Sequence, residues 1–302
     1  MVASRSFPAV LALFALCVPN AAMADEPAPE SYTPSSPWAI DYADDSCALR
    51  RAFTSGEKKL ELEMRQFQPG GDLTILVSGP EMRFAAEEAL IRFGPDDDYI
   101  PKANAFRANL SNGWDGITFR DGLVPSSDVS MVEDRRADNT SYDYWDEHDL
   151  KTRFRAIDNL SIKGALARPI SLELGSMLKP EIALEKCISE LLTHWGIDAE
   201  AHRTLSREVK ILDPMKLAIK LQRNYPRNML VKAKSGVVRV RVNVDETGKP
   251  SACQVQVASQ NREFEETYCK LIMKAARFDP ALDKDGKPIA SYWINRVTFL
   301  MN

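Results

Sequence analysis

Cysteine is the residue type that most restricts the chemistry open to this chain, because an even set of thiols in an oxidising compartment forms disulfides. Five cysteines occur, at Cys17, Cys47, Cys187, Cys253 and Cys269. Cys17 lies in an N-terminal segment that we expect to be removed on export, so four remain. Four cysteines allow three pairings, and joining near neighbours within each half of the chain favours Cys47–Cys187 and Cys253–Cys269. In a reducing cytosol, free buried thiols would be the expectation instead.

Other residues that could carry catalysis or hold a metal lack the spacing that either role needs. Two S-x-x-K sequences, Ser55–Lys58 and Ser176–Lys179, match a motif of penicillin-interacting enzymes, but no S-D-N or K-T-G accompanies them. The sequence holds no G-x-S-x-G, H-E-x-x-H, P-loop or C-x-x-C motif. The acidic runs Asp44-Asp45 and Asp96-Asp97-Asp98 lack the pattern of a calcium-binding loop. We therefore predict a protein that is not an enzyme and that uses no cofactor and no metal.

The N-terminal residues 1–24 have the pattern of a secretory signal peptide. Arg5 supplies a positive charge, and the apolar run Phe7–Val18 is too short to span a hydrocarbon core of about 30 Å as a helix. Ala22-Met23-Ala24 matches a cleavage site, so we expect cleavage after Ala24. The alternative is an uncleaved signal that anchors the protein in the inner membrane.

The charge of the chain changes sign along its length. Residues 25–213 contain 22 Lys and Arg against 35 Asp and Glu, whereas residues 214–302 contain 16 against 8. This shift predicts a domain boundary near Asp213-Pro214. It permits the two halves to attract one another, or the basic half to bind an acidic partner. Nucleic acid is not expected as a partner, because the exported chain is acidic overall.

The first half predicts a disordered leader followed by a β-rich domain. Residues 25–36 are rich in Pro, Ser and acidic side chains and should be disordered. In residues 37–213, short alternating segments separated by turns predict an antiparallel sandwich or barrel. The expected strands are Trp38–Tyr42, Cys47–Phe53, Leu60–Phe67, Asp72–Ser78, Ala89–Phe93, Ile117–Phe119, Ser127–Val132, Thr152–Ile157 and Ile170–Leu174, with a surface excursion over Gly94–Trp114.

A helix should close this domain. Pro180 lies near its start, where proline is tolerated, and Leu184, Cys187, Ile188, Leu191 and Trp195 recur at three- and four-residue steps. Gly196 follows, where a C-terminal cap belongs. Cys187 should therefore point into the domain toward Cys47, with the two Cα atoms within about 7 Å.

The last third, residues 214–302, predicts a separate small α+β unit with one helix on a three-stranded antiparallel sheet. Arg227–Lys234 has helical character. Val237–Val244 alternates strictly, with Val on one face and Arg, Arg and Asn on the other. After the turn Asp245–Gly248, the expected elements are a strand at Cys253–Val257, a helix capped by Asn261, and a closing strand at Tyr292–Leu300.

Four motifs of this unit occur in an order and spacing that carry a resemblance. They are Tyr225-Pro226, GVVRVRVNVDETGKP from Gly236 to Pro250, KAARFDPA from Lys274 to Ala281, and the closing Val297-Thr298-Phe299. The segment resembles the C-terminal domain of TonB, the energy transducer of Gram-negative bacteria. The resemblance implies a periplasmic unit that binds a segment of an outer-membrane transporter by adding it as a strand to an exposed sheet edge.

The resemblance also implies which residues meet the partner. The edge would be Tyr292–Leu300, with Tyr292, Ile294, Arg296 and Thr298 on it. The family's Gln-Pro-x-Tyr-Pro stretch corresponds to residues 222–226, which places Gln222, Tyr225 and Pro226 at the site, although Arg223 replaces the first proline. Tyr225-Pro226 could instead serve packing and chain direction.

The sequence departs from a complete energy transducer in two ways. The signal-like segment contains no histidine of the kind that couples a transducer to an inner-membrane motor, and no long proline-rich spacer is present. Two hypotheses follow. The unit is a protein-binding module linked to outer-membrane transport, or the protein is a structural or ligand-binding periplasmic protein that uses the fold without energy transduction.

Overall fold

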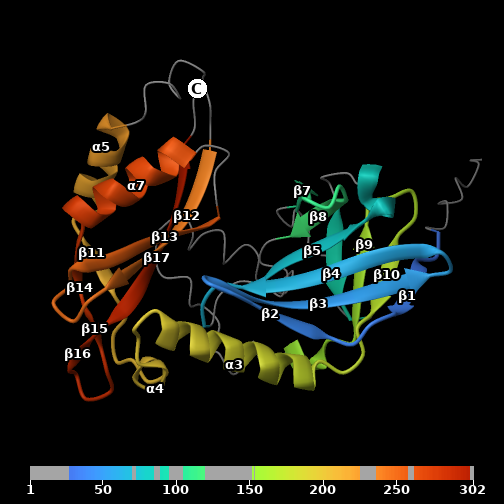
Figure 1. Ribbon diagram of the computed structural model, residues 1–302, viewed down its shortest axis with the longest axis horizontal. Helices are drawn as coiled ribbons and strands as arrows, with labels where there is room; N and C mark the ends of the chain where they lie inside the picture. The colour runs from blue at the N-terminus through green and yellow to red at the C-terminus, as the bar shows by residue number, and fades with distance from the viewer. Residues whose placement is uncertain are drawn as a thin grey trace, which may run out of the picture.

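The computed structural model (Figure 1) describes residues 27–69, 73–84, 89–94, 105–119, 152, 154–224, 236–257 and 262–299. Two apolar clusters organise these residues. The first is built from residues between Tyr32 and Leu191, and the second from residues between Val209 and Ala281. The predicted α+β class is confirmed, with a large sheet in the first unit and a three-stranded antiparallel sheet in the second.

The first unit is built on one ten-stranded sheet, counted over the described residues. Its strands run in the order β6-β9-β10-β1-β3-β4-β5-β8-β7, and β2 also pairs with β3. Neighbouring strands are antiparallel except for β1 and β10, which are parallel. The strands are β1 (Glu30–Pro34), β2 (Ala39–Ala43), β3 (Ser46–Ser55), β4 (Lys58–Gln66), β5 (Thr74–Gly79), β6 (Leu90–Phe93), β7 (Ala105–Asn109), β8 (Asp115–Phe119), β9 (Asn159–Lys163) and β10 (Ile170–Glu173).

Period-two alternation explains the central strands of this sheet. In β4, Leu60, Leu62 and Met64 are fully buried, whereas the intervening residues point to the other face. The neighbouring β3 buries Leu49 and Phe53 in the same cluster. The hairpin predicted from Trp38–Tyr42 and Cys47–Phe53 is confirmed by the antiparallel pairing of β2 with β3.

Three local predictions for this unit differ from the structure, and one strand has no corresponding prediction. The leader predicted to be disordered contains β1, because Tyr32 is buried in the core and Glu30 pairs with Ile170. Residues 154–156 are helical, so the strand predicted at Thr152–Ile157 is wrong. The predicted excursion Gly94–Trp114 contains β7, and β9 was not predicted. The strand expected at Ser127–Val132 lies outside the described residues.

Helix α3 (Leu178–His194) packs against this core through Leu184, Cys187, Ile188 and Leu191. Its last helical residue is His194, and Gly196 follows in the predicted capping position with a left-handed φ of 78°. The N–H of Ile197 donates to the carbonyl of Leu192 in the manner of a Schellman cap. The short helices η1 (Pro80–Phe84) and α4 (Ala199–His202) complete the unit.

The second unit is a three-stranded antiparallel sheet in the order β13-β12-β17. Its strands are β12 (Gly236–Val244), β13 (Pro250–Val257) and β17 (Ser291–Phe299). Helix α7 (Arg262–Ala275) lies on one face and buries Tyr268 and Ile272, and α5 (Pro214–Arg223) packs beside α7 (Figure 1). Smaller strands are β11 (Lys210–Leu212), β14 (Arg277–Asp279), β15 (Ala281–Leu282) and β16 (Pro288–Ile289).

The second unit begins earlier than the charge shift indicates. β11 pairs with β14, and Leu205, Val209 and Ile211 pack in the second cluster. Residues 205–212 therefore belong by packing to the C-terminal unit. Helix α5 was not predicted, and the helix expected at Arg227–Lys234 and the cap Asn261 lie outside the described residues. Within the described ranges, no helix combines the length and apolarity needed to cross a membrane.

Candidate protein-binding edge

Strand β17 forms one edge of the three-stranded sheet. Its inner side pairs with β12 without interruption, from Ser291 opposite Val244 to Phe299 opposite Gly236. Among the described residues, no strand pairs with its outer side. The other edge, β13, pairs with β12 through two register shifts, so it is less regular. β17 is therefore the flatter and longer template for another strand.

The two faces of this sheet have different neighbours. Side chains directly opposite each other in an antiparallel pair share a face. Val240 and Val242 of β12 thus share a face with Asn295 and Trp293 of β17, and Arg241 shares the opposite face with Ile294. We call the first the valine face and the second the arginine face.

Helix α7 covers the valine face. The hydroxyl of Tyr268 donates a hydrogen bond to Oδ1 of Asn295, and the ring of Trp293 lies 5.3 Å from that of Phe278. Burial raises the pKa of Tyr268 far above its ordinary value, so this hydroxyl remains a donor. The predicted disulfide Cys253–Cys269 is confirmed, with a Cα–Cα distance of 5.6 Å, and it ties β13 to α7.

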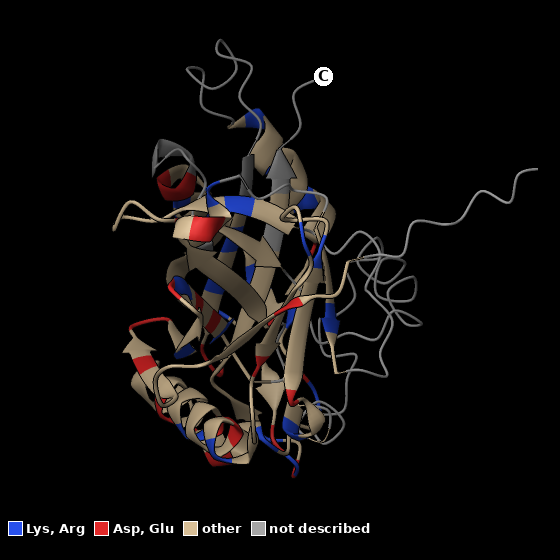
Figure 2. Cartoon of the chain, turned by 90° about the vertical axis from the view of Figure 1, so that its right-hand side faces the viewer, with Lys and Arg blue, Asp and Glu red and all other residues tan. Residues whose placement is uncertain are grey.

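The arginine face packs on the N-terminal unit through Arg241. Its side chain is inserted between the β2–β3 turn and the end of α3. The Nε and Nη2 atoms of Arg241 each lie 2.8 Å from Oδ1 of Asp45, and its guanidinium lies 3.6 Å from the ring centroid of Trp195. The amide of Asn243 donates to the carbonyl of Trp195 at 3.1 Å. Acidic and basic residues occur along the described chain in both units (Figure 2), and Asp45 with Arg241 is one pair of opposite charges between them.

Burial controls the electrostatics of this pair. Arg241 is 5% exposed, and Oδ2 of Asp45 is buried without a hydrogen-bond partner. Desolvation therefore outweighs the attraction of Arg241 and raises the pKa of Asp45 to about 6. Desolvation also lowers the pKa of Arg241, which remains charged because the ordinary pKa of arginine is so high. At neutral pH the contact is a buried ion pair.

Residues of the N-terminal unit also meet the first end of β17. Nε2 of His202 lies 3.0 Å from Oγ of Ser291, and the His202 ring stacks on Tyr292 with centroids 5.1 Å apart and an interplanar angle of 14°. Trp195 meets the same tyrosine ring edge-on at 5.9 Å. Tyr292 is thus enclosed by side chains of its own chain.

The residues predicted to meet a partner fall into three groups. Ile294 is half-buried on β17, while Tyr292 is engaged by His202 and Trp195. Arg296 and Thr298 pair through their backbones with Arg239 and Val237 of β12, and their side chains lie outside the description. Gln222 is exposed in the last turn of α5, and Tyr225 and Pro226 lie outside the described residues.

Sequence reasoning did not identify Trp195 or His202 as neighbours of the edge. Trp195 was interpreted only as part of the apolar face of a helix. Nothing in the spacing of His202 distinguishes it from a surface histidine. The charge difference between the halves did anticipate an attraction, and Asp45 with Arg241 is one pair that realises it.

The second predicted disulfide, Cys47–Cys187, is also confirmed, with a Cα–Cα distance of 6.1 Å. It joins β3 to α3. Asp45 directly precedes β3, and Trp195 directly follows α3, so the disulfide links the two segments that contact Arg241.

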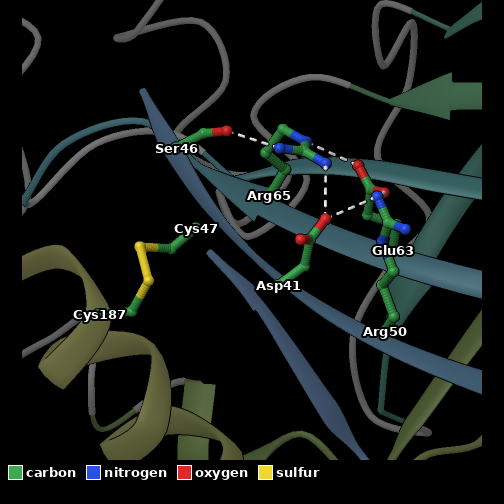
Figure 3. Close-up of polar contacts among 7 residues, drawn as sticks. All are labelled: Asp41, Ser46, Cys47, Arg50, Glu63, Arg65 and Cys187. Carbon is green, nitrogen blue, oxygen red and sulfur yellow. Dashed lines mark hydrogen bonds and ion pairs between the residues drawn. A yellow bond between two sulfur atoms is a disulfide. The ribbon is translucent and has the colours of Figure 1, made fainter. Parts of the chain in front are cut away.

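Beside the disulfide, a chain of ion pairs crosses β2, β3 and β4 (Figure 3): Arg50 lies 2.9 Å from Asp41 and 2.8 Å from Glu63, and Arg65 lies 2.7 Å from Glu63. This network has two charges of each sign, so it is internally neutralised.

The described residues contain no candidate metal site. Among them, no group of three or more His, Cys, Asp or Glu side chains could hold a metal ion. Lys58 of the first S-x-x-K sequence pairs with Glu30 at 2.8 Å, an exposed contact across the sheet end.

Comparison with known proteins agrees with the geometry of the second unit. No curated protein matches the chain. A protein-family model does match part of it, at residues 222–301. The matched segment contains β12, β13, α7 and β17, the three-stranded sheet with its helix. Residues 222–301 thus carry the C-terminal domain of the Gram-negative bacterial TonB protein family.

Proposed function

We propose that this protein is exported to the periplasm, where its C-terminal unit binds an extended segment of an outer-membrane transporter by strand addition at the outer edge of β17. The observation that carries the proposal is the nine-residue ladder from Ser291 to Phe299, whose outer side pairs with no described strand. An edge strand presents unpaired N–H and C=O groups, and an incoming backbone can satisfy them.

The surroundings of the sheet favour this edge over its other surfaces. Helix α7 occupies the valine face, and Asp45 with Trp195 occupies the arginine face at Arg241. A partner that docked on either face would have to displace buried contacts, whereas strand addition along Trp293–Phe299 displaces no strand pairing among the described residues. The match of residues 222–301 to the TonB C-terminal family supports an outer-membrane partner.

The protein in this proposal acts by binding and not by catalysis. The N-terminal unit contacts the arginine face of the sheet and thereby fixes the orientation of the β17 edge relative to the rest of the protein. The signal-like residues 1–24 support export, and the two disulfides are typical of an oxidising compartment.

The proposal is tested with the full-length mature chain and overlapping synthetic peptides from the periplasmic segments of outer-membrane transporters. A captured peptide is then methylated at one backbone nitrogen at a time. Strand addition predicts that alternate positions abolish capture and the intervening positions leave it unchanged, because successive N–H groups of a strand point to opposite sides. Capture that is indifferent to methylation, or the absence of capture, contradicts the proposal and favours a structural or ligand-binding protein.

A proline on β17 provides the complementary test. Of the adjacent residues Ile294 and Asn295, one has its N–H directed away from β12, and proline there should keep the fold, as judged by circular dichroism, and abolish capture. The matched control places proline at Gln254 or Val255 on β13, the opposite edge of the same sheet. The control that retains the fold should capture the peptide as the wild type does.

A further inference from the structure

The outer edge of β17 differs at its two ends. At the first end, His202 contacts Ser291 and Tyr292, two consecutive residues. Consecutive side chains of a strand point to opposite faces. A ring that contacts both therefore lies at the first end of the strand and not over one face alone. The backbone of β12 occupies the inner side at these positions, where Asn243 and Val244 pair with Tyr292 and Ser291. His202 thus lies at the first end of β17, on a side that β12 does not occupy, where a strand added along the outer edge would reach it.

His202 is held in this place by the N-terminal unit. It ends α4, whose N-cap Asp198 accepts hydrogen bonds from the N–H groups of Glu200 and Ala201, both at 3.0 Å. Trp195, at the end of α3, packs on the same tyrosine ring and on Arg241. The position of the histidine is therefore set by the contact between the two units and not by β17 alone.

We propose, on the basis of the function proposed above, that His202 is a specificity-determining residue that closes the first end of the edge and thereby sets the register and length of the added strand. The partner segment pairs with Trp293–Phe299 and stops at the imidazole ring. Seven residues at about 3.3 Å each give an extended segment of about 23 Å. A partner chain that continued in strand conformation past Tyr292 would meet the ring, so it must turn away there.

The experiment compares the wild-type chain with His202→Ala, using the peptide captured in the methylation experiment and a version extended by two residues toward Ser291. Amide exchange resolved by residue should show that the peptide protects outward-facing amides of β17 only from Trp293 onward in the wild type. In H202A, the extended peptide should also protect the amide of Ser291 or Tyr292. The extended peptide should bind H202A about fivefold tighter than the shorter peptide does, which is the gain expected from one further hydrogen bond. The two peptides should bind the wild type equally tightly.

Two further variants separate this role from a merely structural one. Ser291→Ala removes the hydrogen bond but leaves the ring in place, so the register should not change. Glu200→Gln alters an exposed side chain of the same helix and should behave as the wild type. If H202A folds and captures the peptide in the unchanged register, the proposal for His202 is overturned while strand addition stands. If neither chain captures any peptide, strand addition itself is overturned, and the role of His202 with it.

Discussion

Replacing Arg241 by methionine should loosen the contact between the two units while leaving each sheet intact. Methionine keeps much of the apolar length of the side chain and removes the guanidinium. The variant therefore loses the ion pair with Asp45, the contact with the ring of Trp195 and the hydrogen bond to Asn243. It leaves the valine face of β12 unchanged.

The size of the loss can be worked from these contacts. With a pKa of about 6, Asp45 favours its ionised form at pH 7 by about 1 kcal/mol, so protonation limits the electrostatic loss to about that value. A desolvated cation–π contact contributes about 1 to 2 kcal/mol, and the hydrogen bond to Asn243 about 1 kcal/mol. Methionine recovers part of this by packing on Trp195. We expect the free energy of unfolding to fall by about 3 kcal/mol.

The measurement is urea unfolding followed by circular dichroism at pH 7, with the disulfides intact. Arg223→Met is the matched control, because Arg223 is exposed at the end of α5, and it should change the free energy by less than about 0.5 kcal/mol. In an Asp45→Asn background, R241M should cost about 1 kcal/mol less than in the wild type. An R241M variant as stable as the control would show that the buried pair does not hold the units together, and the reasoning would fail.

Three further changes test other parts of the structure. Because folding raises the pKa of Asp45 from 3.8 to about 6, the folded state binds this proton more tightly than the unfolded state. As the pH falls from 7 to 4, the free energy of unfolding of the wild type should therefore rise by about 2 kcal/mol relative to that of Asp45→Asn. Parallel titrations of the two proteins would contradict this. Replacing Cys253 and Cys269 together by serine opens a short loop and should cost about 3 kcal/mol, measured by thermal unfolding with a reduced wild-type sample as the comparison. Gly248→Ala would place a Cβ atom 2.0 Å from a backbone carbonyl oxygen and should lower the free energy of unfolding by at least about 3 kcal/mol. Gly286 has a similar φ but open space around it, so Gly286→Ala should lower it by about 1 kcal/mol. Equal losses would refute the steric reason.

Local pattern predicted the second unit well because its sequence carries strong periodic signals. From Val238 to Val244 the valines of β12 alternate strictly, and each of Val238, Val240, Val242 and Val244 is buried. The turn at Gly248 follows from a residue type suited to its left-handed φ of 78°. Both disulfides followed from assigning the cysteines to two folding units, since each unit could then hold one pair.

The failures have equally local reasons. Residues 25–36 look disordered by composition, but β1 is stabilised by distant partners, β10 and β3, that composition cannot reveal. Helix α5 was missed because it spans only 10 residues, and of its apolar side chains only Leu217 and Leu221 are buried. The polar face of β12 was predicted correctly as polar, but a strand pattern does not say whether such a face meets water or another unit. Arg241 meets Asp45, 196 residues away in sequence.

Among the described residues no strand pairs with the outer side of β17, and this is itself an argument for binding. A long and regular edge strand is an aggregation hazard, and proteins ordinarily protect such edges with bulges, prolines or covering elements. The opposite edge, β13, has two register shifts, begins at Pro250 and is tied to α7 by a disulfide. β17 pairs with β12 without a shift, and from Trp293 to Phe299 its outer side faces no described strand. His202 contacts the first two residues, Ser291 and Tyr292. Among the described residues, the same small sheet carries these protective features on one edge and not along Trp293–Phe299 of the other, so a strand that arrives from a partner best explains this part of β17.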